Sequence, residues 1–68
     1  MKTISGQELA RLIEKKGWEL RRVQGSHHIY ARSDNPARIS IPIHGNRPLK
    51  LGLLKHLMKI AGITESEL

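Results

Sequence analysis

Hydrophobic residues recur at helical spacing near both ends of the chain. The stripe near the N-terminus consists of Leu9, Leu12 and Ile13. Residues spaced by three and four lie on one face of a helix, so this stripe predicts a helix over residues 6–16. Ser5 and Glu8 have the spacing of a capping box at its start, and Gly17, which follows two lysines, marks its end.

A second stripe of the same kind lies in the C-terminal third of the chain. It consists of Leu54, Leu57, Met58 and Ala61. The stripe predicts a helix that opens at Pro48 or Leu49, because proline suits the first helical turn, and that ends at Gly62. Residues 64–67 begin another capping pattern just before the last residue, which predicts a single helical turn or a frayed tail there.

Between the two stripes, hydrophobic and polar residues alternate with the period of two that is typical of strands. Three such segments occur, at residues 18–23, 27–32 and 38–43. The alternation in the first segment breaks at Arg21 and Arg22, which a β-bulge there would explain, as would a strand that ends at that point. Pro42 cannot donate to a sheet ladder, so we expect the third segment at an edge of the sheet or with Pro42 on its unpaired side.

The order of these segments is helix, three strands, helix. Short connections between the strands predict an antiparallel three-stranded sheet, with both helices free to cover the same face. We therefore expect residues 1–68 to form one α+β domain of two layers. The α-β-β-β-α order is also that of double-stranded-RNA-binding domains, which is an analogy of topology and not of function.

The charge balance narrows the kinds of partner that such a domain would bind. Twelve lysines and arginines against six acidic residues give a net charge of +6, which favours a nucleic acid, an anionic membrane or an acidic protein. Trp18 and Tyr30 are the only aromatic residues, too few for a protein that stacks successive bases of a single strand. We expect Trp18 in the core, whereas Tyr30 either packs there or stacks on a base.

Two features that the sequence lacks limit the compartments in which we expect the protein. The chain has no cysteine, which excludes disulfides and thiolate metal sites. No apolar run approaches the roughly 18–20 residues of a membrane span, and the N-terminus lacks the apolar core of a signal peptide. We therefore expect a cytoplasmic protein that does not act at a membrane.

The candidate chemistry lies in two adjacent histidines, His27 and His28, which follow the glycine turn at Gly25. Histidine, with an unperturbed pKa of about 6.5, exchanges protons near neutral pH, as a base that takes a proton from an RNA 2′-hydroxyl must do. Neighbouring residues of a regular strand point to opposite faces, so the two histidines should not share a face. Ser26 is placed to hold a phosphate oxygen or to orient a ring. The basic residues suited to phosphate contacts are Arg21, Arg22, Arg32, Arg38 and Arg47.

The other histidines give weaker signals. His27, His28 and His44 are a conceivable set of metal ligands, but their spacing matches no known metal motif, so we expect no metal and no other cofactor. His44 is either an auxiliary residue of the site or an ordinary loop residue. His56 falls on a lysine-bearing helical face, where we expect it to be inert.

Four segments of the sequence resemble the HicA toxins of bacterial toxin–antitoxin systems. They are Gly17-Trp18, Gly25-Ser26-His27-His28-Ile29-Tyr30, Ile41-Pro42-Ile43-His44 and Ala61-Gly62-Ile63. The resemblance implies a double-stranded-RNA-binding-like fold, a ribosome-independent mRNA endoribonuclease and a HicB antitoxin that masks the active site. It also implies that the catalytic histidine of the family corresponds to His27, or to His28 if the motif is read one place later.

The working hypothesis is thus a toxin that cleaves mRNA through a histidine without a metal and is neutralised by an acidic HicB-type antitoxin. The residues expected to contact RNA are Ser26, Arg21, Arg22, Tyr30, Arg32 and Arg47. Two alternatives stay open: a non-catalytic RNA- or DNA-binding module, and a structural domain whose basic face docks an acidic protein.

Overall fold

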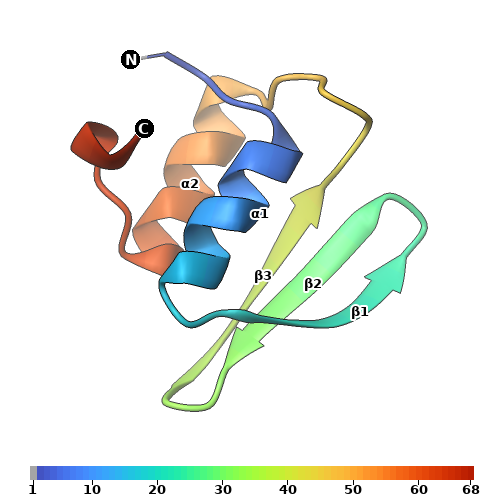
Figure 1. Ribbon diagram of the computed structural model, residues 1–68, viewed down its shortest axis with the longest axis vertical. Helices are drawn as coiled ribbons and strands as arrows, with labels where there is room; N and C mark the ends of the chain where they lie inside the picture. Colours follow the sequence, from blue (N-terminus) through green and yellow to red (C-terminus); the bar gives the residue numbers. More distant parts are fainter. Residues whose placement is uncertain (1) are drawn as a thin grey trace.

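The computed structural model describes residues 2–68 and has two layers. The elements follow in the order α1 (Gly6–Lys15), β1 (Glu19–Gln24), β2 (His27–Arg32), β3 (Asn35–Pro42), α2 (Leu51–Ala61) and a 3₁₀ turn η1 (Glu65–Glu67). The strands form one antiparallel sheet in the order β1-β2-β3. Both helices lie on the same side of this sheet (Figure 1). The predicted α+β class, the strand order and the edge position of β3 are therefore confirmed.

The ends of the helices follow from local hydrogen bonds. The Ser5 hydroxyl accepts from the Glu8 amide at 3.2 Å and the Glu8 carboxylate accepts from the Ser5 amide at 3.3 Å, which is the predicted capping box. Helix α2 ends as predicted at Gly62, whose φ of 75° is in the left-handed region.

The start of α2 differs from the prediction. The helix begins at Leu51, not at Pro48 or Leu49. Pro48 instead forms an isolated antiparallel bridge with Ser5, and the Leu49 amide donates to the Ile4 carbonyl at 2.8 Å. This pairing holds the residues before α2 in an extended conformation, so the first helical turn forms later in the chain.

Of the two explanations for the break in alternation, the structure has the bulge, at Arg21, and β1 continues beyond it. Leu20 pairs with Tyr30 and Arg22 pairs with Ile29, which leaves Arg21 as the extra residue. Because cross-strand partners share a face of the sheet, the bulge places Arg22 opposite the helix side. A regular strand that continued from Leu20 would have turned Arg22 toward the helices.

The core lies between the helices and strands β2 and β3. Its fully buried side chains are Leu9, Ile13, Ile39, Ile41 and Leu54. Trp18 is 2% exposed and packs in this core, as predicted. All six residues of β1 are exposed, so the helices cover the other two strands and leave β1 open. Among the residues that the structure describes, no helix is long and apolar enough to span a membrane.

Candidate active site

The two adjacent histidines lie on opposite faces of β2. His28 pairs with Ile41, which is completely buried beneath the helices, so His28 faces the helix side. His27 pairs with Pro42 and therefore faces the open side of the sheet. His27 is exposed, whereas His28 is half-buried. An exposed imidazole on the uncovered face can reach a large substrate directly.

The open face next to His27 is basic. One step along β2 on this face, Ile29 lies between Arg22 of β1 and Ser40 of β3. Residues two apart along a strand are about 6.5–7 Å apart, so this row is close to His27. A shallow hollow on the face is lined by Arg21, Arg22, Ile29, Arg38 and Ser40. We call it the sheet-face hollow.

The arginines of the sheet-face hollow differ in their partners. Arg21 forms an ion pair of 3.2 Å with Glu19, but both side chains are largely exposed, so the pair is weak. Arg22 and Arg38 form no ion pair with any residue between 2 and 68. Their guanidinium groups are therefore available to an anion that lies across the sheet.

A second hollow adjoins His27 where β3 leads into α2. It is lined by Pro42, His44, Arg47, Pro48, Leu49, Lys50 and Leu53, and we call it the junction hollow. Pro42 is the cross-strand partner of His27, so the hollow begins beside the histidine. The Ile43 amide also donates to the Ser26 carbonyl at 2.8 Å, which ties this loop to the β1–β2 turn.

Hydrogen bonds hold the loop of the junction hollow in shape. The Arg47 amide donates to the His44 carbonyl at 3.1 Å across a tight turn, in which Gly45 has a φ of 58°. Such a turn keeps its first and last Cα atoms within about 7 Å of each other. His44 and Arg47 are therefore neighbours, and the loop is anchored beyond them by the bond between Leu49 and Ile4.

Tyr30 does not belong to the exposed surface. Its ring is 2% exposed on the helix side, and its hydroxyl donates to the Glu14 carboxylate at 3.0 Å. Burial raises the pKa of Tyr30 to about 12, and the hydrogen bond to Glu14 and its negative charge act in the same direction. The ring has no face free for a base, so we do not retain Tyr30 among the expected RNA contacts.

Arg32 also lies away from the site, at the far end of β2. Its guanidinium donates to Asp34 at 2.6 Å and to the Lys16 carbonyl at 3.0 Å, and it stacks over the Trp18 ring at 5.3 Å from the centroid. Five residues of strand, about 16 Å, separate it from His27. Its contacts give Arg32 a structural role, and it too is removed from the expected RNA contacts.

The remaining expected residues are brought together around His27. Arg21 and Arg22 line the sheet-face hollow, Arg47 lines the junction hollow, and Ser26 precedes His27 in the turn. Ser40, Pro42 and Leu53 also line these hollows but were not among the expected site residues. The alternation along β3 could have identified Ser40 and Pro42, because both lie on the face of the strand opposite to that of its buried isoleucines.

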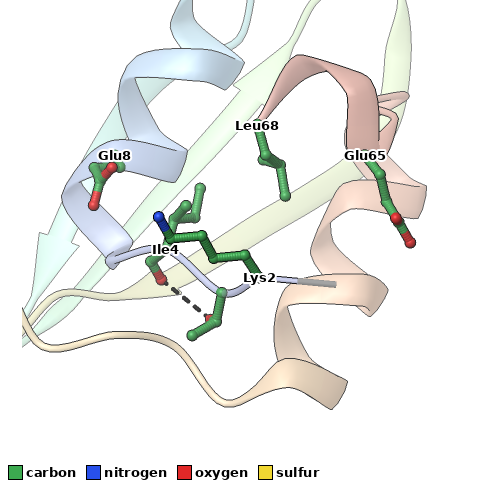
Figure 2. A pocket seen from close by; sticks show the side chains of 6 residues that line it. Lys2, Ile4, Glu8, Glu65 and Leu68 are labelled. Carbon is green, nitrogen blue, oxygen red and sulfur yellow. Dashed lines mark hydrogen bonds between the residues drawn. The ribbon is translucent and has the colours of Figure 1, made fainter.

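A third hollow lies between the chain ends and α1, and Figure 2 shows it from close by. It is lined by Lys2, Thr3, Ile4, Glu8, Glu65 and Leu68. Its lining carries both positive and negative charges and includes no histidine, so it is a weaker candidate site than the surface around His27. Within residues 2–68, no three histidine or acidic side chains gather as a metal site would require.

The fold and the site define a small basic α+β domain with a histidine on the uncovered face of its sheet. Residues 6–63, which contain both helices and the whole sheet, match the family described as the HicA toxin of bacterial toxin–antitoxin systems. The chain therefore belongs to the HicA toxin family. No curated protein matches it.

Proposed function

We propose that this HicA toxin is a ribosome-independent mRNA endoribonuclease in which His27 is the catalytic base. The observation that supports this most is the position of His27, which is exposed on the open face; the sheet-face hollow includes the next residue of β2 on that face, and the junction hollow includes its cross-strand partner Pro42. A single RNA strand that crosses His27 would thus meet arginines both before and after the reacting phosphate.

The proposed reaction needs no metal. The neutral imidazole of His27 takes the proton of a ribose 2′-hydroxyl, and the 2′-oxygen attacks the adjacent phosphorus. The bond to the 5′-oxygen breaks and this oxygen takes a proton from solvent water, which gives a 2′,3′-cyclic phosphate and a 5′-hydroxyl end. The imidazolium of His27 then returns its proton to water. Arg22, one row away, would stabilise the negative charge that builds on the phosphate.

A single acid–base group supplies about 10²–10⁴-fold in rate. We therefore expect a slow enzyme, which suits a toxin because its damage accumulates over many messages.

His28 is the second candidate for the catalytic histidine. It is half-buried on the helix side, between Val23 and Ile41 in the sheet. A substrate on the open face would not touch it without a rearrangement of β2. We therefore assign His28 a supporting role in the packing of this end of the hairpin.

The proposed partner is a HicB-type antitoxin that is acidic and covers the open face. Arg22 and Arg38 would supply the complementary charges there, and such a partner would shield His27 from RNA by lying on the same surface. An excess of antitoxin is then expected to stop RNA cleavage by the purified toxin.

The test is cleavage of end-labelled RNA by purified protein in EDTA. We expect the parent to shorten the RNA and to leave cyclic phosphate ends. His27→Ala should reduce the rate by at least about 10²-fold, while His28→Ala should retain cleavage. His56→Ala is the matched control, because His56 is exposed on α2 away from both hollows. Circular dichroism of each variant separates lost chemistry from lost folding.

Two results would contradict the proposal. Unchanged cleavage by a folded His27→Ala variant would exclude this histidine as the base. Intact RNA after incubation with the parent would instead favour one of the two alternatives. RNA binding that weakens as salt is added would identify a nucleic-acid-binding module, and the absence of RNA binding would identify a docking domain.

A further inference from the structure

We propose that the junction hollow is a nucleotide subsite, which binds the base and the phosphate of one RNA residue next to the phosphate that is cleaved. This inference rests on the proposed function for its role in cleavage. The binding of a nucleotide in the hollow, however, can be tested without any reaction. Three features of the hollow support the proposal: the chemistry of its lining, its rigidity and its position.

The lining combines apolar and cationic groups on one small surface. Pro42, Pro48, Leu49 and Leu53 supply the apolar part. His44, Arg47 and Lys50 supply nitrogen donors for an anion. A nucleotide has the same two parts, since a base presents flat apolar faces and a phosphate presents charged oxygens.

Leu53 is the most informative residue of the hollow. It lies in the first turn of α2, and its side chain is 36% exposed, whereas Leu54 beside it is completely buried in the core. A site for phosphate alone would not require a leucine at this position. A site for an apolar peptide alone would not require an arginine and a lysine in the same lining.

The lining is held in place before any ligand binds. The turn between His44 and Arg47 fixes these two residues as neighbours, and the Thr3 hydroxyl and the Ile4 carbonyl hold both backbone groups of Leu49. The loop therefore loses little conformational entropy when a ligand binds, which favours affinity.

The position of the hollow gives the subsite its role. The junction hollow begins at Pro42, the cross-strand partner of His27. The sheet-face hollow includes Ile29, the next residue of β2 on the same face as His27. The loop between β3 and α2 and the turn between β1 and β2 lie at the same end of the sheet (Figure 1). A strand whose reacting phosphate is at His27 would thus place one flanking nucleotide in the junction hollow.

The first test uses NMR titration of the isotopically labelled parent protein with nucleoside 5′-monophosphates and, separately, with inorganic phosphate. We expect the amides of Arg47, Lys50 and Leu53 to shift with the nucleotides, and more strongly than with phosphate. Equal shifts with both ligands would overturn the proposal, because they would show an anion site without base recognition. No shift in these amides would overturn it as well.

The second test measures the affinity of variants for a short 2′-O-methyl RNA, which cannot be cleaved by this reaction. We expect Leu53→Ser and Arg47→Gln each to weaken binding about 5- to 10-fold. The matched controls are Leu51→Ser and Lys59→Gln, which change exposed residues of α2 outside the hollow. Equal losses in the Leu53 and Leu51 variants would contradict the subsite.

The two proposals fail in different ways. If nucleotides shift the hollow but the parent never cleaves RNA, the nuclease proposal fails and the nucleotide site stands. If RNA is cleaved but nucleotides leave the hollow unchanged, the nuclease stands and the subsite is wrong. If only the antitoxin shifts these amides, the hollow is a protein interface and the subsite is also wrong.

Discussion

Gly6 and Gly52 allow the packing in the structure to be tested with one substitution at two positions. Each lies in the first turn of a helix, and neither has a positive φ. A Cβ atom on Gly6 would collide with the Pro42 carbonyl oxygen and would come within 3.0 Å of Ile43 Cγ1. A Cβ atom on Gly52 would have no atom within 4 Å apart from those of its chain neighbours and of the adjoining helix backbone. The same change to alanine should therefore have opposite effects.

The magnitudes follow from these contacts. The oxygen that blocks the Gly6 position is part of the backbone, so a change of rotamer cannot relieve the clash and α1 must move away from β3. Overpacking of this kind costs about 1–3 kcal/mol, and since 1 kcal/mol changes the Tm of so small a domain by about 4–8 °C, Gly6→Ala should lower it by roughly 5–20 °C. Gly52→Ala should instead stabilise by about 0.5–1 kcal/mol, because alanine is the better helix former.

The assay is thermal unfolding followed by circular dichroism, with urea unfolding as a second measure of the free energy. RNA cleavage by the folded Gly6→Ala variant is also informative, since the clash falls on Pro42, the cross-strand partner of His27. A Gly6→Ala variant that melts with the parent would refute the close approach of α1 to β3. A Gly52→Ala variant as unstable as the Gly6 variant would refute the argument from space.

Three further predictions concern single side chains. Tyr30→Phe should destabilise by about 1 kcal/mol through the lost bond to Glu14. The folded state raises the pKa of Tyr30 to about 12, whereas the pKa in the unfolded chain is about 10. The parent should therefore lose stability as the pH rises above about 10. The Tyr30→Phe variant should lack this loss in unfolding experiments at high pH. Arg22→Gln should weaken RNA binding and reduce the salt dependence of that binding. Arg32→Gln should lower the Tm with little effect on RNA binding. Equal losses of RNA binding in the two variants would contradict the placement of Arg22, and not Arg32, at the site. Ser5→Ala should cost about 1 kcal/mol in urea unfolding through the lost helix cap, and unchanged stability would contradict the capping box.

The features that the sequence predicted well are those set by neighbouring residues. The capping box at Ser5, the left-handed Gly62 and the bulge at Arg21 all depend on a few consecutive positions. The start of α2 was wrong by two or three residues, because Pro48 pairs with Ser5, which is far away in the sequence. No local pattern contains that contact.

The candidate site shows the same division between local and distant effects. Alternation along β2 correctly placed His28 and Tyr30 on one face and His27 on the other. Both faces carry apolar residues, however, so alternation alone did not say which face the helices would cover. The removal of Tyr30 and Arg32 from the expected RNA contacts therefore depended on tertiary structure, through their contacts with Glu14 and Lys16.

The bulge in β1 adds a positive charge beside the open face but interrupts the pairing of β1 with β2. Deleting Arg21 would leave every other pair between β1 and β2 intact, since Leu20 and Arg22 already face consecutive residues of β2. The shortened hairpin would have an unbroken ladder and one fewer positive charge beside the open face. We therefore expect the shortened protein to be more stable but less toxic, which would mean that the bulge serves binding and not folding.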